Sequence, residues 1–411
     1  MNRSLIPAAV LSLALTGAAA AQQDPQSFDR VEKGRYLSVL SDCAGCHTAP
    51  GGQPFAGGLA LDTPFGKLVA PNITPDRETG IGNLTEDEFV SALQDGRGHN
   101  GKRLYPAMPY PAYTKLSRDD VLAMRAYFRT VQPVNNSVES NQLPFPFNIR
   151  LAMVFWNWLN FKPGRLEPNP QKSAEWNRGA YIVESAAHCG TCHTPKTMLG
   201  GDKTSEALAG ATLQGWFAPN ITTNGHVGIG GWSREDLVQY LKTGANAYSL
   251  ASGPMSEAVT HSTSQMSDAD LNAIAAYLKD SGAPNDGAKP APVAANDNAM
   301  RIGAAVYKDS CAACHKDSGM GESHLFPKLA GSAIVQSNDP TTLAHVVLTG
   351  AQAAATDGAP TGPAMPAFNW RLDDAQVAAV LTYIRNSWGN AAAPVAASAV
   401  GAQRKSQARF D

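Results

Sequence analysis

The chain has 411 residues, of which 43% are hydrophobic and 17% charged, and its formal net charge at pH 7 is -2. This length allows about two to four ordinary domains, and the hydrophobic fraction is sufficient for buried cores. The near-neutral charge offers no basic field for a polyanion, so we expect no nucleic acid among the partners.

Residues 1–21 are typical of a secretory signal peptide. Arg3 supplies the positive start, residues 5–15 are apolar, and residues 19–21 form a small-residue cleavage site before Gln22. The alternative is a retained N-terminal anchor helix. The longest later apolar stretch, residues 151–161, falls short of the roughly 20 residues that span a bilayer. We therefore expect an exported protein that is soluble or held peripherally at a membrane.

The first domain is predicted over residues 28–134. It starts with an amphipathic helix in "GRYLSVLSDCAGCH" and closes with a second helix after Leu116, where a hydrophobic residue precedes a serine N-cap and acidic residues fill the first turn. Cys43, Cys46 and His47 form a C-x-x-C-H motif, the signature of covalent c-type haem attachment. The two thiols bond to the haem, and the adjacent histidine is the proximal ligand of the iron.

A methionine opposite the proximal histidine would complete the iron coordination and raise the reduction potential. In "LYPAMPYP", Met108 lies between prolines, 61 residues after His47. Proline flanks restrict the backbone of such a loop. We therefore predict Met108 as the second axial ligand of the first haem; the alternative is an ordinary core methionine.

Residues 135–173 form a long connector that is rich in aromatic side chains. Its central part reads "LPFPFNIRLAMVFWNWLNFKPG". Such a segment is either a strap that packs on its own domains or a docking surface for a partner or a membrane. Burial of both Trp156 and Trp158 between the chain's own domains would exclude the docking surface.

The second domain is predicted over residues 174–282 and closely duplicates the first. The attachment motif recurs at Cys189, Cys192 and His193, and the segments "APNIT" and "GIG" recur at an offset of 148 residues. Repetition of this kind indicates tandem copies of one structural unit.

Three residues compete to be the second axial ligand of the second haem. If the repeats are aligned on their closing helices, Met266 matches Leu116 and Leu372, the apolar staple position before the N-cap. If the loops are aligned, Met255 matches Met108 at an offset of 147 residues. His261 has no counterpart in the other repeats. We therefore predict Met255.

A third domain is predicted over residues 299–389, after a Pro- and Ala-rich linker at residues 283–298 that we expect to be flexible. Cys311, Cys314 and His315 form the third attachment motif, and "GPAMPAFNW" places Met365 50 residues after His315 as the predicted axial ligand. The tail, residues 390–411, is Ala-rich with late basic residues, and we predict that it is disordered.

The three motifs use all six cysteines of the chain. We therefore predict three covalently bound haem c groups and no disulfide bond. The rival interpretation, redox-active or zinc-binding C-x-x-C pairs, is disfavoured because a histidine follows every pair. The remaining histidines lie in polar segments and are expected to be solvated, with His188 of interest because it adjoins a motif: His99, His188, His226, His261, His324 and His345.

Together, the two "APNIT…GIG" repeats, "LYPAMPYP", "LPFPFNIR…WN", "GPMSEAV" and "AMPAFNWRL" resemble the three-haem cytochrome c subunits of bacterial membrane-bound dehydrogenases. This group includes the cytochrome subunits of gluconate, sorbitol, fructose and quinoprotein alcohol dehydrogenases. The resemblance extends from about residue 28 to residue 388. It implies an all-α fold of three tandem class I cytochrome c-like domains, in which a loop proline offers its carbonyl to the proximal histidine. Pro71, Pro219 and Pro327 are the candidates, unless they are ordinary loop prolines.

The resemblance also implies a function. The chain would be an electron-transfer subunit, not an enzyme by itself, that accepts electrons from a flavoprotein or quinoprotein dehydrogenase subunit and passes them to ubiquinone or another respiratory acceptor. The complex would lie on the periplasmic side of the cytoplasmic membrane, and a small third subunit is a further expected partner. No dinucleotide-binding or nucleophile-elbow motif is present in the sequence.

Two other functions are compatible with haem chemistry. The first is a haem enzyme such as a multi-haem peroxidase, which needs an iron position open to substrate. A methionine candidate for each haem argues against it. The second is a free-standing soluble electron shuttle, which co-purification with a large flavoprotein or quinoprotein would exclude.

Overall fold

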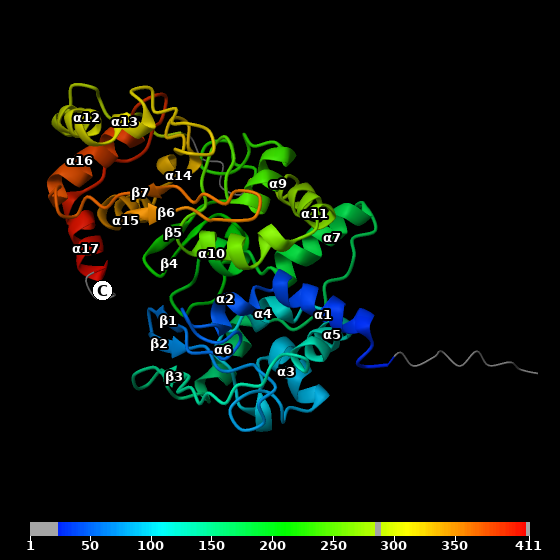
Figure 1. Cartoon of the computed structure of the whole chain (residues 1–411). Helices are drawn as coiled ribbons and strands as arrows, with labels where there is room; N and C mark the ends of the chain where they lie inside the picture. Colours follow the sequence, from blue (N-terminus) through cyan, green and yellow to red (C-terminus); the bar gives the residue numbers. More distant parts are fainter. Residues whose placement is uncertain (1–23, 284–288, 408–411) are drawn as a thin grey trace, which may run out of the picture.

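The computed structural model describes residues 24–283 and 289–407. The predicted signal peptide and residues 284–288 of the predicted linker lie outside this range. Three repeats follow one another along the chain, and Figure 1 shows them as blue to cyan, green, and yellow to red groups of helices. The aromatic connector follows the first repeat.

Each repeat is built on a pair of crossing helices. The pairs are α1 (Phe28–Leu40) with α5 (Arg118–Phe128), α7 (Ala174–Tyr181) with α11 (Asp268–Leu278), and α12 (Asn298–Ser310) with α16 (Asp374–Arg385). A Cβ atom added to Gly34, Gly179 or Gly303 would lie 1.8, 1.9 or 2.2 Å from a main-chain carbonyl oxygen of the facing helix. Only glycine therefore permits these crossings.

The starts of the three closing helices confirm the predicted N-caps. The side chains of Ser117, Ser267 and Asp373 each accept a hydrogen bond from the main-chain N–H three residues later. The preceding apolar residues are all buried, as the staple interpretation requires: Leu116, Met266 and Leu372.

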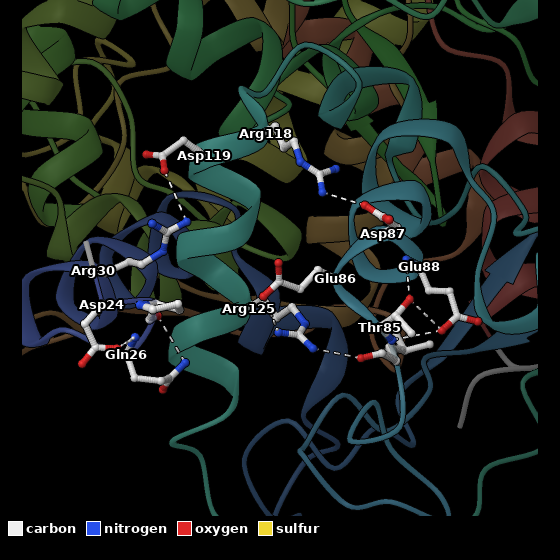
Figure 2. A network of polar contacts seen from close by, with 12 residues as sticks. Asp24, Gln26, Arg30, Thr85, Glu86, Asp87, Glu88, Arg118, Asp119 and Arg125 are labelled. Atoms are coloured by element: carbon white, nitrogen blue, oxygen red, sulfur yellow. Dashed lines mark hydrogen bonds and ion pairs between the residues drawn. The ribbon is translucent and has the colours of Figure 1, made fainter. Parts of the chain in front are cut away.

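In the first repeat, three short helices, a 3-10 turn and two short strands lie between the crossing helices. The elements are α2 (Cys43–His47), β1 (Ala60–Thr63), β2 (Gly66–Val69), α3 (Glu86–Asp95), the 3-10 turn η1 (His99–Gly101) and α4 (Tyr110–Tyr113). Figure 2 shows how α3 is attached to α5: Arg118 pairs with Asp87 at 2.6 Å, and Arg125 pairs with Glu86 at 3.3 Å. The exposed Arg118–Asp87 pair contributes little stability, whereas the side chain of Arg125 is only 11% exposed.

The connector contains two elements, β3 (Asn141–Gln142) and α6 (Ala152–Asn160). The second repeat then follows the plan of the first. Its elements between the crossing helices are the π-helical turn η2 (Ile182–Ala186), α8 (Gly190–His193), η3 (Thr204–Glu206), β4 (Ala211–Leu213), β5 (Trp216–Ala218), α9 (Arg234–Thr243), α10 (Pro254–His261) and η4 (Thr263–Gln265). Buried residues of these two repeats form one continuous hydrophobic cluster, so the repeats share a core.

The third repeat has its own hydrophobic clusters. Its further elements are α13 (Ala312–His315), α14 (Ala333–Gln336), α15 (Thr341–Thr349), β6 (Ala351–Gln352), β7 (Ala364–Met365) and α17 (Ala397–Gln407). Residues 289–297 of the predicted linker precede α12, and within them the main-chain N–H of Val293 donates to Asn386 at 2.9 Å.

The expectation of a disordered tail is wrong for residues 397–407. They form α17, which packs against α15 and α16. Val400 is fully buried in this contact, and Arg404 pairs with Asp374 at 2.8 Å and donates to the carbonyl of Leu372 at 2.9 Å. Alanine favours helix once such tertiary contacts hold one face.

The expectation of an all-α fold also needs correction, because seven short strands accompany the helices in the described residues. They form an antiparallel sheet in the order β1-β2-β3 and two hairpins, β4-β5 and β6-β7. None of the strands is longer than four residues. Among residues 24–283 and 289–407, no helix is both long enough and apolar enough to cross a membrane.

Candidate haem sites

The three C-x-x-C-H motifs occupy equivalent places at the end of the first helix of each repeat. In each, the histidine is the last residue of a short helical segment, α2, α8 or α13. All six cysteine side chains are free thiols. The fold therefore presents two thiols and one imidazole together at three separate positions.

Each motif histidine is held by the carbonyl of the proline expected from the sequence. The Nδ1 atoms of His47 and His193 lie 2.7 Å from the carbonyl oxygens of Pro71 and Pro219. The Nδ1 atom of His315 lies 3.1 Å from the carbonyl oxygen of Pro327. Since a carbonyl can only accept, Nδ1 carries the proton and Nε2 keeps its lone pair for a metal.

The electrostatics of the motifs favour neutral side chains. Burial lowers the pKa of His47, His193 and His315, so these imidazoles are neutral at physiological pH. Burial raises the pKa of Cys189 to about 12 and that of Cys311 to about 11. Redox-active C-x-x-C pairs instead have a thiol with a depressed pKa.

The donor set fits haem better than a bare metal ion. No group of three or more His, Cys, Asp or Glu side chains in the described residues is arranged to hold a metal ion, and these residues include every cysteine. A structural zinc site needs four protein ligands. A haem iron needs only axial ligands from the protein, so two thiols and one imidazole are sufficient.

The three predicted axial methionines are half-buried and pack against hydrophobic clusters. Met108 lies just before α4 and packs against the shared core of the first two repeats, and Met365 ends β7 and packs against a core cluster of the third. Met255 lies in the first turn of α10 and packs against a small cluster that includes Ala251 and Val259. Each of these methionines is therefore held by apolar contacts without being fully buried.

The two alternative candidates for this axial ligand, Met266 and His261, differ from Met255 in their burial. Met266 is 1% exposed and belongs to the core cluster that the first two repeats share, as the staple interpretation predicts. His261 ends α10 and is exposed. Helix α10 also contacts α2 of the first repeat, so Met255 belongs to an element that lies next to the first attachment motif.

Two tyrosines, one from each of the first two repeats, form reciprocal hydrogen bonds that join these repeats. The hydroxyl of Tyr36 accepts from the main-chain N–H of Ser267 at 3.0 Å and donates to Asp270 at 2.8 Å. In the opposite direction, the hydroxyl of Tyr181 accepts from the N–H of Ser117 at 3.0 Å and donates to Asp120. Each tyrosine thus binds the start of the other repeat's closing helix.

The acceptors of these tyrosines are oriented by cations of their own repeats. Asp120 pairs with Lys33 at 2.7 Å, and Asp270 accepts two bonds of 2.8 Å from Arg178. The arrangement is that of an isologous interface, in which the same patch on two similar units pairs with itself. The motifs of the sequence did not predict this interface.

The sequence nevertheless contains one feature that could have indicated this interface: a tyrosine shortly before the attachment motif in both repeats. Tyr36 precedes Cys43 by seven residues, whereas Tyr181 precedes Cys189 by eight. The π-helical turn η2 accommodates the additional residue between Tyr181 and the motif. The two tyrosines can therefore occupy equivalent positions despite the unequal spacing.

The segments before the first two motifs also touch each other. The carbonyl of Ser41 accepts from the hydroxyl of Tyr113 at 3.1 Å, and His188 Nε2 lies 3.3 Å from the same oxygen. The rings of Tyr113 and His188 pack edge to face, 5.5 Å apart. His188 is therefore not simply solvated, and it links the residue before Cys189 to the approach to Cys43.

Asp42 is a further residue that sequence analysis missed. It directly precedes Cys43 and has a left-handed backbone with φ of 47°. Its Oδ1 atom has no hydrogen-bond partner among the described residues. Burial raises the pKa of this carboxyl to about 7, so its charge changes near physiological pH.

The other histidines divide between exposed and packed positions. His99, His261 and His324 are exposed, as expected. His345 is half-buried and stacks on Trp216, with ring centroids 4.0 Å apart, where the third repeat meets the second. His226 is partly buried as well.

The aromatic connector is partly a strap and partly exposed. Trp156 is only 9% exposed and donates to the carbonyl of Leu199, in the second repeat, at 2.7 Å. Trp158, two residues later, is 77% exposed. Burial of both tryptophans would have excluded a docking surface. Trp158 is not buried, so the docking interpretation stays open.

Comparison with known proteins agrees with this geometry. The sequence model of the cytochrome c family matches residues 177–282 and 300–388, which contain the second and third motifs. The chain is also similar over most of its length to cytochrome subunits of three dehydrogenases.

The gluconate 2-dehydrogenase cytochrome c subunit of Pantoea cypripedii is 42% identical, and the alignment covers 97% of this chain and 95% of that protein. The cytochrome c subunit of the quinone alcohol dehydrogenase of Gluconobacter oxydans (strain 621H) is 39% identical over 91% of this chain and 81% of its own. The fructose dehydrogenase cytochrome subunit of Gluconobacter japonicus is 39% identical over 90% of this chain and 82% of its own.

Proposed function

Because this chain belongs to the family of cytochrome c subunits of dehydrogenases, we propose that it holds three covalent haem c groups and uses them to pass electrons from a catalytic partner to ubiquinone or another respiratory acceptor. As a member of this family the chain is an electron-transfer subunit rather than the catalytic one. A bound haem would supply one-electron transfer at its iron.

The chain's own residues would hold the three haems in equivalent ways. Cys43 and Cys46, Cys189 and Cys192, and Cys311 and Cys314 would form the thioether bonds, and His47, His193 and His315 would be the proximal ligands. The carbonyls of Pro71, Pro219 and Pro327 support this assignment, because they orient each imidazole with Nε2 free.

Met108, Met255 and Met365 would be the opposite axial ligands. Their half-buried positions against hydrophobic clusters support the assignment. Met255 is preferred over Met266, whose side chain is a core residue at a helix start. A thioether opposite imidazole would give each haem a comparatively high potential.

Three cytochrome c domains would carry these sites, at residues 28–134, 174–282 and 299–389. The family match supports the second and third of these domains. The first domain is supported by the same crossing of helices at a glycine, the same motif position and the same histidine-to-proline hydrogen bond. The all-helical frame of a class I cytochrome c would then be extended by the short hairpins.

The partner would be a dehydrogenase subunit with a flavin or quinone cofactor, which oxidises an alcohol, a sugar or a sugar acid. The names of the relatives support this substrate range, because they are subunits of enzymes for gluconate, alcohol and fructose. A small third subunit would complete the complex. Export by residues 1–21 would place it on the periplasmic side of the cytoplasmic membrane.

The single observation that carries the proposal is the threefold recurrence of two thiols beside an imidazole that a proline carbonyl orients. The test is to co-express the chain with a candidate flavoprotein or quinoprotein dehydrogenase subunit and to follow the haem absorbance after substrate is added. We expect full reduction of three haems per chain and re-oxidation by a soluble ubiquinone analogue.

Two results would overturn the proposal. Rapid binding of carbon monoxide or peroxide to the untreated reduced protein would indicate an open iron position and favour a haem enzyme. Failure to co-purify with any flavoprotein or quinoprotein, combined with reduction by unrelated donors, would favour a free-standing shuttle.

A further inference from the structure

Helix α6 exposes the face that its sequence makes apolar. Leu151, Val154, Phe155, Trp158 and Leu159 recur at the spacing of one helix face and are all exposed. We call these five residues the strap face. Fifteen large apolar side chains are exposed in the described residues, and eight of them lie between residues 145 and 159, so the exposure is concentrated rather than scattered. Concentrated exposure of this kind marks an interaction site.

The opposite face of α6 is anchored, which fixes the orientation of the strap face. Trp156 donates to the carbonyl of Leu199, and Asn157 accepts from the hydroxyl of Tyr110 at 2.6 Å. The rings of Tyr110 and Trp156 pack edge to face, 6.3 Å apart. The strap face therefore cannot turn inward without breaking these partly buried hydrogen bonds. Met198 and Leu199 of the second repeat, both exposed, extend the apolar surface.

The charges around the strap face are mainly positive. Residues 140–166 contain no Asp or Glu. A cleft of about 490 Å³ beside α6 is lined by Val154, Trp158 and Phe161 together with Arg97 and Arg103, and Asp95 is its one acidic residue. Within residues 24–283 and 289–407, neither arginine forms an ion pair. Lys102 and Lys162 nearby also lack carboxylate partners in that part of the chain.

We propose that the strap face and its cationic cleft bind the interface of an anionic phospholipid bilayer. Phe, Leu and Trp side chains on an exposed helix face enter the boundary between headgroups and acyl chains, and unpaired Arg and Lys at the rim attract phosphate groups. The proposal rests on the periplasmic membrane location in the proposed function. A protein partner would place acidic side chains of its own against these cations, and that alternative is an outcome of the test.

The test measures binding of the full-length, haem-loaded protein to sedimenting lipid vesicles. The vesicles contain either phosphatidylcholine alone or phosphatidylcholine with phosphatidylglycerol. The variant Phe155→Ser/Trp158→Ser should lower the partition coefficient for the anionic vesicles by roughly ten-fold or more, because two interfacial aromatic side chains are lost. The matched control Phe28→Ser/Trp370→Ser removes two aromatic side chains that are each 77% exposed elsewhere, and it should have no effect.

A second pair of variants tests the charges separately. Arg97→Gln/Lys162→Gln should weaken binding to anionic vesicles by roughly five-fold for each charge removed and leave binding to neutral vesicles unchanged. The control Lys308→Gln/Lys405→Gln removes two exposed lysines of the third repeat and should bind as the wild type does.

Three outcomes contradict the lipid proposal: no binding of the wild type to anionic vesicles, equal loss with the control variants, or loss of the catalytic partner instead of vesicle binding. In detergent, haem reduction by the partner should be the same in the wild type and in all four variants. If that reduction fails in the wild type, the proposed function fails, while the vesicle result still decides the lipid proposal independently.

Discussion

Removal of the hydroxyl group of Tyr36 should destabilise the start of the closing helix in the second repeat, because that hydroxyl forms hydrogen bonds there. In Tyr36→Phe, the N–H of Ser267 loses its acceptor and Asp270 loses one donor, at distances of 3.0 and 2.8 Å. Arg178 remains bonded to Asp270, so no carboxylate is left without a partner. A hydrogen bond to a charged group contributes roughly 1.5–3 kcal/mol. We therefore expect about 2 kcal/mol less free energy for local opening at the start of α11.

Hydrogen–deuterium exchange with mass spectrometry measures this local free energy. A loss of about 2 kcal/mol corresponds to roughly 30-fold faster exchange in a peptide that covers residues 264–270. The peptide that covers residues 114–120 should not change in Tyr36→Phe. Tyr181→Phe should produce the reverse pattern, because its hydroxyl accepts from Ser117.

Tyr127→Phe is the matched control, since the hydroxyl of Tyr127 forms no hydrogen bond in the described part of the chain. It should leave both peptides unchanged. Equal acceleration of both peptides in Tyr36→Phe would refute the reciprocal arrangement and indicate general destabilisation. Unchanged exchange in both single variants would show that the hydroxyls contribute nothing to the interface.

The remaining predictions concern the haem sites. Mass spectrometry of the acid-unfolded holoprotein should find three haems and no cystine, because the motifs use all six thiols; fewer haems or any cystine would contradict this. Met255→Ala should make one haem of three high-spin and able to bind carbon monoxide, whereas Met266→Leu should leave the spectrum nearly unchanged because Met266 is a core residue. The opposite result would reassign the ligand. Burial raises the pKa of Asp42 to about 7, and a negative charge directly before Cys43 would stabilise the ferric form of a haem bound there. The potential of the first haem should therefore fall as the pH rises through 7 in titrations of the wild type, and Asp42→Asn should remove this step.

The attachment motifs, the helix starts and the order of the repeats could be predicted from the sequence because each depends on neighbouring residues. A C-x-x-C-H motif is a local covalent requirement. A serine or aspartate that follows an apolar residue at a helix start caps the helix within three residues, as Ser117, Ser267 and Asp373 do. Comparison of the repeats also favours Met255 over Met266 from the sequence alone.

Other features depended on residues that are distant in the chain. The pairing of Tyr36 with Asp270 joins residues that are 234 positions apart, and no local pattern specifies that pairing. The apolar face of α6 has the periodicity of a buried helix, yet the contacts of Trp156 turn it outward. The Ala-rich segment before residue 407 is helical only because Val400 and Arg404 find partners on the third repeat.

By itself, the sequence predicted the chemistry of this protein: three sites, each with two thiols and one imidazole. These follow from covalent and local rules, which act over a few residues. Only the tertiary structure decided how the first two sites are held together, through Ser41, His188 and the exchanged tyrosines. It also decided which aromatic side chains remain exposed. Burial and polar pairing are collective properties of segments far apart in the chain, so they become visible only when the chain is folded.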